Sequence, residues 1–495
     1  MKYFWLAVIL SGLLFTVLFS HQYGIFNRRS SIPENTLQVA PASVSARNTW
    51  KNIFQNGIKI GVSHSNLSRS DSGYVLRETL HLRINTMGMT QNISVDTTGR
   101  LHSDLSLSTF SFAISSGRFR FHASGSVNGE TLSVITRNTD SFQKQNIRLD
   151  RKIYLTAGIF DALMAADSKK MMSVNVFDPS TLSQQPVTIT KLDDEQIVVM
   201  GTPQKTRKLS LNFKGITQYA WINESGEILR EQGLFGITLE KTSREDALFG
   251  MPLESSQDLA KIASVPANIR INDPSKHHSL KVKISGISLG DTGIDGGRQL
   301  LEGNLLTVNK EILPDTTTPH ISILPEKYSE FLKPSVFIQS ENPKIRTLAL
   351  KITENSPRPL DSVKKLMAWI EKNIVKKPVL SLPDALSTLD NRMGDCNEHA
   401  MLFAALARAI GIPCKVEAGL VYLDGRFYYH AWNAVFVGRW ITVDALFAQI
   451  PADVTHLRLT SGVQKIELDI MGIIGKINIE IIEVPAASAG ESSSG

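Results

Sequence analysis

Three residues in the C-terminal part of the chain have side chains suited to covalent catalysis. Cys396 comes first, and His430 and Asp444 follow in that order. A cysteine thiolate can attack an amide carbonyl, an imidazole can carry the proton, and a carboxylate can orient the imidazole and stabilise its charged form. These residue types predict a catalytic triad that transfers an acyl group through a thioester.

A helix should position the cysteine. Asp395 can cap a helix, and the apolar residues after Cys396 recur at helical spacing as far as Ile410. The free backbone N–H groups and the dipole at such an N-terminus should lower the pKa of the Cys396 thiol. The same N–H groups are candidate donors to a tetrahedral oxyanion.

Three short strands should position the other two side chains. Period-two alternation between turn residues predicts strands at 415–423, 427–437 and 440–443. A hairpin that turns at 438–439 places His430 opposite a position within a few residues of Asp444. We therefore expect the imidazole and the carboxylate to lie close together.

The same region resembles a known family. The segments GDCNEHA, ARAIGIP, YHAWN and WITVD are similar, in this order, to the bacterial transglutaminase-like superfamily, which shares a papain-like core. The resemblance extends over roughly residues 335–460 and implies that Cys396, His430 and Asp444 are the catalytic triad. The family often has Asp-Pro-Thr where this chain has Asp-Ala-Leu from Asp444 onward, a difference that concerns the local geometry.

Residues beside the triad are candidate supporting groups. Trp432 is expected either to pack beside the imidazole or to line the cleft. Asn433 is a candidate hydrogen-bond donor behind the triad, and Asp395 is the expected helix cap.

Two further residues have less chemical interpretations. His399 lies one helical turn from Cys396, where structural packing is favoured over a catalytic contact. Cys414 is expected to be a buried strand residue. The helix should hold the Cα atoms of Cys396 and Cys414 too far apart for a disulfide bond.

The region before this segment is predicted to be mainly β structure. Residues 49–243 alternate between apolar and polar side chains, and turn residues interrupt them. The pattern predicts a large antiparallel β domain, with a bulge where the alternation changes phase within 105–114. Its apolar face must be covered, by curling into a barrel or half-barrel or by another layer. The domain could be a lipid or peptide cradle or a structural platform. Residues 244–334 are predicted to form a helical connector and a small β module.

The N-terminal segment is strongly apolar. Residues 3–19 contain no charged side chain, which predicts a transmembrane signal-anchor at 1–29, followed by a polar linker at 30–48. A cleaved signal peptide is the alternative. This interpretation places the protein in a bacterial inner membrane, with most of the chain in the periplasm or otherwise outside the cytoplasm.

Composition excludes several classes of protein. The formal net charge is +6, but the basic residues are dispersed, which argues against nucleic-acid binding. Two cysteines are too few for a disulfide-stapled scaffold. The sparse histidines and cysteines predict no metal site, and we expect no cofactor.

These observations predict an α+β protein with an N-terminal transmembrane anchor, a large antiparallel β domain and a papain-like transglutaminase core. The core is expected at 335–485, followed by a disordered polar tail at 486–495. The predicted function is membrane-anchored amide acyl transfer or hydrolysis on protein or peptide substrates, with cell-wall peptides as one candidate class. The alternative is a non-catalytic envelope scaffold, or a lipid- or peptide-binding protein that uses the β domain. The sequence makes no prediction of oligomeric state.

Overall fold

The computed structural model describes residues 44–485, except for gaps at 87–88, 118, 138–141, 156–170, 181, 214–215, 251–256, 290–292, 315–325, 380–383 and 462–472. The described residues form two compact units that divide near residue 262. The predicted membrane anchor, most of the predicted linker and the predicted tail lie outside the described residues. Within the described ranges, no helix is long and apolar enough to cross a membrane.

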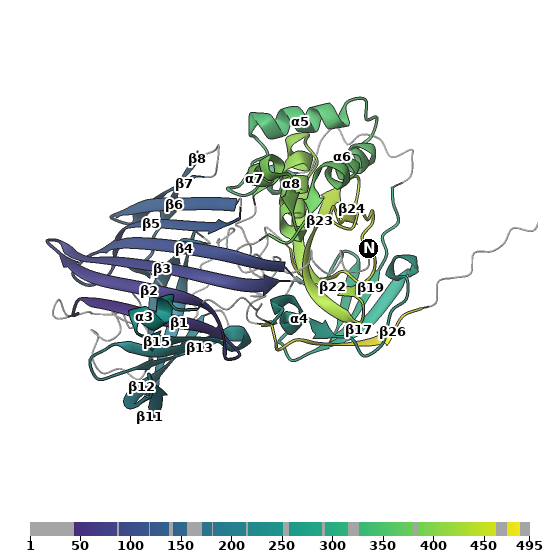
Figure 1. Ribbon diagram of the computed structural model, residues 1–495. Coiled ribbons are helices and arrows are strands. Elements are labelled where there is room, and N and C mark those ends of the chain that lie inside the picture. The colour runs from purple at the N-terminus through teal and green to yellow at the C-terminus, as the bar shows by residue number, and fades with distance from the viewer. Residues whose placement is uncertain are drawn as a thin grey trace, which may run out of the picture. The chain divides into compact units, whose positions relative to one another are not determined.

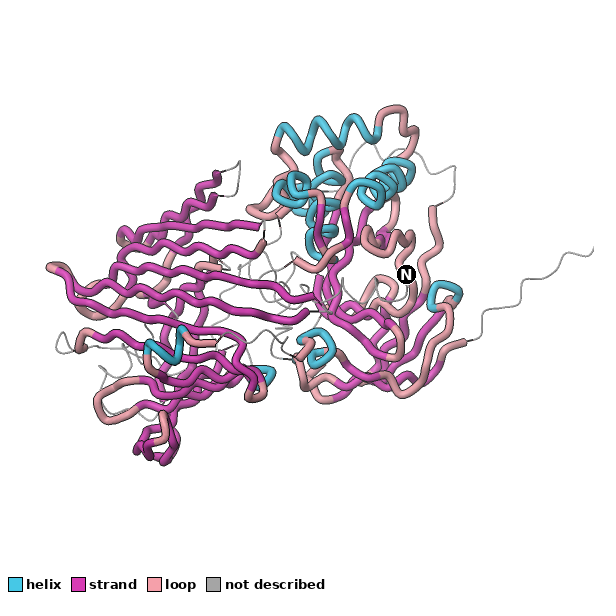
Figure 2. Tube along the Cα trace, viewed as in Figure 1, coloured by secondary structure: helices cyan, strands magenta, loops and turns pink. Residues whose placement is uncertain are grey.

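The fold class differs from our expectation. Most of the described regular structure is strand, as Figure 2 shows, so the α+β assignment is wrong and the chain is mainly β. The reason is the extent of one sheet in the N-terminal unit, which continues through 15 strands. Among the described residues, every helix longer than five residues belongs to the C-terminal unit.

The N-terminal unit is one continuous sheet (Figure 1). In chain order its strands are β1 (Arg47–Gln55), β2 (Ile58–Ser70), β3 (Gly73–Thr86), β4 (Met89–Leu101), β5 (Leu107–Ser116), β6 (Phe119–Asn128), β7 (Thr131–Arg137), β8 (Phe142–Arg148), β9 (Ile153–Leu155), β10 (Met171–Asp178), β11 (Ser183–Val199), β12 (Thr202–Phe213), β13 (Ile216–Ile222), β14 (Ile228–Gln232) and β15 (Ile237–Thr242). Their order across the sheet runs from β8 back to β1, then to β15, and from there back to β9.

This strand order requires the sheet to curl. The two edge strands, β8 and β9, are consecutive in the chain and are separated by residues 149–152. Five Cα steps reach at most about 18 Å. A flat sheet of this size would hold its edges about 67 Å apart, at about 4.8 Å between neighbouring strands. The rings of Phe110 on β5 and Phe177 on β10 are 4.9 Å apart, as expected if the curled sheet brings separate strands together.

Alternation along the strands explains which face is covered. Phe119, Phe121 and Ala123 of β6 are buried, and the residues between them are exposed or half-buried. The predicted break in alternation is also present. Arg100 on β4 pairs with Thr109 on β5, but Leu101 pairs with Leu107, so the register shifts by one residue within β5. Beyond β15, the expected helical connector consists of α3 (Arg244–Leu248) and α4 (Leu259–Ala263).

The C-terminal unit contains two main sheets and a group of helices. Its strands are β16 (Val265–Pro266), β17 (Ser279–Ser285), β18 (Gln299–Glu302), β19 (Leu305–Asn309), β20 (Val375–Lys376), β21 (Met393–Gly394), β22 (Cys414–Leu423), β23 (Arg426–Phe436), β24 (Trp440–Val443), β25 (Leu457–Ser461) and β26 (Asn478–Glu483). Its helices are α5 (Pro343–Thr353), α6 (Pro359–Asn373), α7 (Ala385–Asn391) and α8 (Cys396–Ala409), with 3₁₀ turns η4 (Pro274–Lys276) and η5 (Glu326–Leu332).

Both sheets join strands that are far apart in the sequence. The first has the order β16–β23–β22–β25, with β24 paired to β23, and the helices α5, α6 and α7 contact α8 beside it. The second has the order β18–β19–β17–β26. We expected the small β module to end before a catalytic domain that starts at 335. The late strand β26 instead pairs with the early strand β17, so this sheet draws on both sides of that position.

The helix starts follow recognisable signals, with one exception. Asn342 caps α5 through a hydrogen bond from the Lys344 N–H. The structure places Arg358 at the N-cap of α6, and no side-chain cap is formed there. Asp361 lies in the first turn and accepts two hydrogen bonds from the Arg358 guanidinium.

We predict that a close backbone approach makes Gly419 necessary. A Cβ atom at Gly419 would lie 2.0 Å from the Leu457 carbonyl oxygen and 2.9 Å from the Leu459 nitrogen. Because both obstacles are backbone atoms of β25, Gly419→Ala should cost about 1–3 kcal/mol of stability. Gly233→Ala is the matched control, since its Cβ would meet nothing closer than 3.9 Å. Calorimetry of the full chain measures both, and equal transition temperatures would contradict the prediction.

Candidate active site

Cys396 is the first residue of α8, as the sequence predicted. Asp395 is the N-cap: it accepts a hydrogen bond from the Asn397 N–H at 2.9 Å, and Glu398 completes a capping box by accepting from the Asp395 N–H at 3.0 Å. The cap engages the N–H groups of Asn397 and Glu398. Among the first three helix amides, the Cys396 N–H is the one that the cap does not use, so it is the helix-terminus donor available to an oxyanion.

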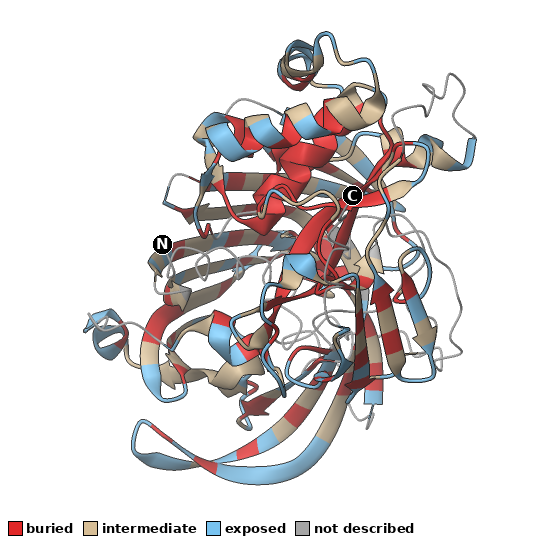
Figure 3. Cartoon of the chain, turned by 90° about the vertical axis from the view of Figure 1, so that its right-hand side faces the viewer, coloured by how far each residue is buried: buried red, intermediate tan, exposed pale blue. Residues whose placement is uncertain are grey.

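The helix that carries the cysteine is buried on all sides. Every residue of α8 except the last is buried, and buried residues are red in Figure 3. Asn433 on β23 donates to the Ala400 carbonyl at 3.1 Å and to the Lys415 carbonyl at 3.3 Å. Asn433 therefore fixes α8 to the sheet and does not contact the triad.

His430 lies on β23, and its ring has a defined orientation. Its Nε2 atom is 2.6 Å from Asp444 Oδ2. The ring is nearly parallel to Phe447, at 4.8 Å between centroids, and to Trp432, at 6.0 Å. Nδ1 has no hydrogen-bond partner among the described residues, although the side chain is fully buried. Since Nε2–H donates a hydrogen bond to Asp444, Nδ1 of the neutral ring carries a lone pair that can accept a proton.

The structure brings the cysteine to the same place. The N–H of Ala431, which follows His430 on β23, donates a hydrogen bond to the Cys396 sulfur. The thiol is therefore adjacent to the backbone of the strand that carries the imidazole. All three predicted triad residues are buried, with exposed fractions of 1% for Cys396 and 0% for His430 and Asp444.

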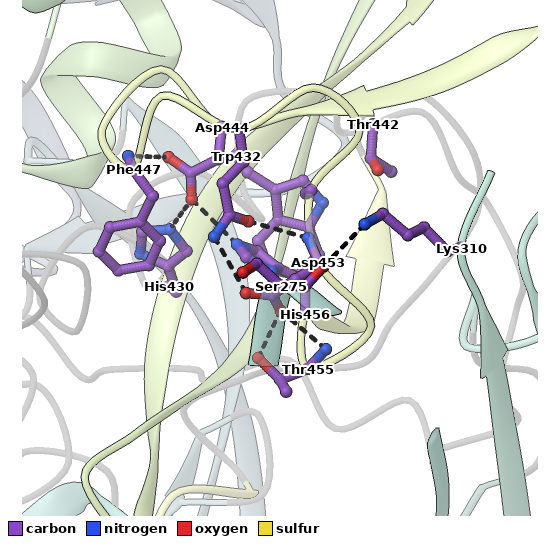
Figure 4. Close-up of polar contacts among 12 residues, drawn as sticks. Ser275, Lys310, His430, Trp432, Thr442, Asp444, Phe447, Asp453, Thr455 and His456 are labelled. Atoms are coloured by element: carbon purple, nitrogen blue, oxygen red, sulfur yellow. Dashed lines mark hydrogen bonds and ion pairs between the residues drawn. The ribbon is translucent and has the colours of Figure 1, made fainter. Parts of the chain in front are cut away.

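Asp444 follows β24 directly and is satisfied on both oxygens. Its Oδ1 atom accepts from the N–H groups of Leu446 and Phe447, each at 2.8 Å. Its Oδ2 atom accepts from His430 and from a second histidine, His456, at 3.0 Å. Figure 4 shows Asp444 with both rings. The Asp-Ala-Leu segment thus supplies backbone donors where the family often has Asp-Pro-Thr.

His456 is a site residue that sequence reasoning missed. It precedes β25, and its other ring nitrogen, Nδ1, is 3.1 Å from Asp453 Oδ1. Asp453 also accepts from the N–H and hydroxyl of Thr455 at 2.9 and 2.6 Å. No motif in the sequence indicates this cluster. A prediction that β25 pairs with β22 would have brought the residues before β25 to the site.

A buried arginine holds the segment that carries Asp453 and His456. The Arg298 guanidinium donates to the carbonyls of Ala452, Asp453 and His456 at 2.6, 2.7 and 3.1 Å. It also pairs with Glu311 at 3.0 Å. No local pattern in the sequence connects Arg298 with Cys396, which lies 98 positions later, or with His430 and Asp444.

The remaining predicted residues have structural contacts. Trp432 stacks beside the imidazole and donates through Nε1 to Glu417 at 3.0 Å. His399 Nδ1 is 2.7 Å from the Asp395 carbonyl oxygen within the helix. Cys414 is a buried strand residue, and both cysteines are free thiols.

Electrostatics differs from our expectation for the nucleophile. We expected the helix N-terminus to lower the pKa of Cys396, an effect worth about 0.3–2 kcal/mol. Burial and the negative charge of Asp395 instead raise the pKa of the thiol well above its usual value, with the Ala431 hydrogen bond as a partial offset. Burial outweighs the dipole because it can shift a pKa by about 3–5 units.

The histidine and the aspartate shift in opposite directions. Burial lowers the pKa of His430, and Asp444 offsets this only in part. Burial alone would raise the pKa of Asp444, but the bonds from His430 and His456 hold it far below its usual value. The resting site therefore contains a neutral thiol, a neutral imidazole and an ionised carboxylate.

The cluster of His430, Asp444 and His456 also has the composition of a metal site. One ligand atom from each lies within 4.8 Å of the others. Two ligands about 2.1 Å from a tetrahedral ion would lie about 3.4 Å apart. The N–O distances of 2.6 and 3.0 Å are shorter and fit direct hydrogen bonds. The geometry therefore fits protons between these atoms better than an ion.

Comparison with known families agrees with this arrangement. Residues 346–445 match the sequence model of the transglutaminase-like superfamily core. This match covers about a fifth of the chain. The matched segment contains Cys396, His430 and Asp444 and ends before His456. The C-terminal unit thus contains the core of a cysteine enzyme at the level of this superfamily. No curated protein is similar enough to count as a match.

Three solved structures show limited similarity to the chain. A proposed cysteine protease from Cytophaga hutchinsonii is 17% identical, with 41% of this chain and 83% of that chain covered and a TM-score of 0.27. A β-barrel-like protein of unknown function from Brucella abortus is 10% identical, with 40% and 94% covered and a TM-score of 0.33. A proposed protease from Parabacteroides distasonis is 11% identical, with 66% and 64% covered and a TM-score of 0.20.

The resting state of the transglutaminase-like site predicts how the thiol responds to pH. Because the pKa of Cys396 is raised, alkylation by iodoacetamide should be slow at pH 7 and should still increase above pH 9. Peptide mass spectrometry separates Cys396 from Cys414. A rate that reaches a plateau below pH 7 would show a resting thiolate–imidazolium pair instead.

The arginine brace predicts a second effect, on stability. Arg298→Met should destabilise the C-terminal unit by about 3–5 kcal/mol, since it removes the cation that pairs with the largely buried Glu311 carboxylate. Lys310→Met is the control, because that lysine makes one exposed bond, to the Ser275 carbonyl. Denaturant unfolding gives the free energies, and amide exchange at 452–456 reports the brace directly. Equal protection in both variants would contradict the brace.

Proposed function

We propose that the transglutaminase-like domain catalyses amide acyl transfer or hydrolysis on a protein or peptide, through a thioester on Cys396. The observation that carries this proposal is the orientation of His430. Its Nε2–H is held by Asp444 at 2.6 Å, and its Nδ1 lone pair is unengaged beside the strand that contacts the thiol. An imidazole held in this way has its basic nitrogen available for one task, which is to accept and return a proton.

The first half of the reaction forms the thioester. The Cys396 sulfur attacks the amide carbonyl carbon while His430 Nδ1 takes the thiol proton. The imidazolium that forms is stabilised by the ionised Asp444. The negative charge on the carbonyl oxygen falls near the N–H of Cys396 at the start of α8. When the C–N bond breaks, His430 gives the proton to the leaving nitrogen, so that an amine departs and the acyl group stays on sulfur.

The second half releases the acyl group. Water or an amine gives a proton to His430 and attacks the thioester carbon, and the C–S bond breaks to return the thiol. Water as the acceptor produces cleavage or deamidation, and an amine produces a cross-link. Proton movement is concerted with attack in this scheme, because neither the thiol nor the imidazole is charged at rest.

The alternative is a domain that serves as a non-catalytic scaffold. Burying the Asp444 carboxylate and its two imidazole partners costs solvation free energy that an apolar packing would avoid. A scaffold has no use for this arrangement, and a proton relay requires it. The burial of the whole cluster therefore favours the enzyme.

Replacement of the triad residues should separate their roles. Cys396→Ala should remove turnover while leaving the fold intact. His430→Ala should cost about 10⁴-fold or more, since both proton transfers are lost. Asp444→Asn should cost less, about 10²–10⁴-fold. Cys414→Ala is the matched control and should keep most of the activity.

The assay uses the full chain with glutamine-donor proteins and peptidoglycan stem peptides. Ammonia release, new peptide termini and cross-linked masses distinguish the possible second acceptors. Hydroxylamine intercepts a thioester and gives a hydroxamate. Appreciable turnover by Cys396→Ala on any of these substrates would overturn the proposed mechanism.

A further inference from the structure

The His456 side chain joins two carboxylates. Its ring is fully buried, with Nε2 3.0 Å from Asp444 Oδ2 and Nδ1 3.1 Å from Asp453 Oδ1. An ionised carboxylate can accept a hydrogen bond but cannot donate one. Each ring nitrogen must then carry a proton, and an imidazole with two N–H groups is a cation.

The neighbours of Asp453 agree that its carboxylate is ionised. Oδ1 accepts from the Thr455 N–H and hydroxyl, and Oδ2 accepts from the Gln449 side-chain amide at 3.0 Å. All of these groups donate to the carboxylate, which has no need of a proton of its own.

We propose that His456 is a positioning residue of the catalytic site: as a buried cation between Asp453 and Asp444, it fixes the Asp444 carboxylate and offsets its charge toward His430. This inference rests on the proposed function, since it assigns a role in that reaction. His456 does not touch the thiol. It acts through the oxygen that it shares with His430.

The charges around the ring support this assignment. Burial alone would lower the pKa of His456, but Asp453 and Asp444 outweigh it and raise that pKa to about 9. His430 is the other titratable group at Asp444, with a ring centroid 5.6 Å from that of His456. On the backbone side, the Arg298 guanidinium donates to the His456 carbonyl.

Two further groups act on the catalytic end of the cluster. Lys376 and Asp444 influence each other electrostatically, and His399 is affected by Lys376, Asp444 and His430. Burial lowers the pKa of His399 to about 4, so that ring is neutral at neutral pH. His456 is therefore the imidazolium that acts on His430 at neutral pH.

The consequence concerns the basicity of His430. A cation on the shared oxygen makes Asp444 a weaker partner for the His430 imidazolium, and its charge contributes to the lowered pKa of His430. A less basic His430 leaves the proton on the thiol at rest. The same property makes the transient imidazolium a stronger acid toward the leaving amine.

Two substitutions divide the role of His456 into charge and hydrogen bonding. His456→Gln places an amide N–H where Nε2 lies, which keeps a donor to Asp444 and removes the charge. His456→Asn places its amide nearer the position of Nδ1 and loses the donor to Asp444. Comparison of the two variants separates electrostatic tuning from orientation.

The readout is the alkylation of Cys396 by iodoacetamide in the full chain, which needs no knowledge of the substrate. Removing the charge should raise the pKa of His430 and so increase the population of the thiolate–imidazolium pair. One unit of pKa is a tenfold change in that population. We expect His456→Gln to be alkylated about tenfold faster than the parent at pH 6–7, with its circular dichroism unchanged, and to be impaired in acyl transfer. His456→Asn should combine a raised alkylation rate with a lower melting temperature.

A second measurement detects the proposed cation directly. In nuclear magnetic resonance spectra of histidine-labelled protein, one ring should remain doubly protonated at pH 8, and its signals should disappear in both variants. A folded His456→Gln that is alkylated no faster than the parent would overturn the proposal. A parent alkylation profile that changes on dialysis against a chelator would also overturn it, since an ion would then join the side chains.

The experiments distinguish a failure of this inference from a failure of the proposed function. Turnover that survives Cys396→Ala refutes the thioester mechanism, whatever the alkylation rates are. Unchanged alkylation in folded His456→Gln refutes the role of His456, even if all three triad variants are inactive.

Discussion

The C-terminal unit depends on how a single buried carboxylate is satisfied. Asp444 has no solvent to stabilise its charge, so four donors from the protein replace water: two backbone N–H groups on one oxygen and two imidazoles on the other. An unpaired charge in this position would cost several kcal/mol. The turn after β24, the strand that carries His430 and the entry to β25 must therefore all converge on it.

This requirement explains why the site needs the second sheet. The segment 452–456 is irregular, and its carbonyls need donors once they are buried. Arg298 supplies those donors from the turn before β18. In return, Arg458 on β25 donates to the carbonyls of Gly293 and Gly296, which precede β18. The small β module is thus part of the support for the Asp444 carboxylate.

Local signals in the sequence predicted the helix and strands around Cys396, His430 and Asp444 well. The helix start at Cys396 and the three strands after it are close to their expected positions, because a cap residue, turn glycines and a change in period mark each boundary. Proximity of His430 and Asp444 followed from one hairpin. His456 and Arg298 could not be found in this way, since they reach the site through the β22–β25 pairing and through a sheet that joins distant segments.

The fold class was missed for a related reason. Alternation identifies strands but does not say how many of them join one sheet, and the curl of the N-terminal unit follows from which strands form its edges. The pKa of Cys396 was missed because the sequence shows the helix N-terminus and does not show the depth of burial. Local rules gave the direction in which the helix dipole shifts the pKa of Cys396. Tertiary packing buries the thiol and shifts that pKa further in the opposite direction.

The pairing of β17 with β26 also determines when this sheet can form during synthesis of the chain. A ribosome delivers residues 279–285 long before residues 478–483, and domains generally fold as units, N-terminal first. The N-terminal sheet can close while the rest of the chain is still being made. The sheet that supports Asp444 cannot, so a nascent chain that already contains Cys396 lacks the complete arrangement around Asp444. Any acyl-transfer activity would then begin only after residues 478–483 have left the ribosome.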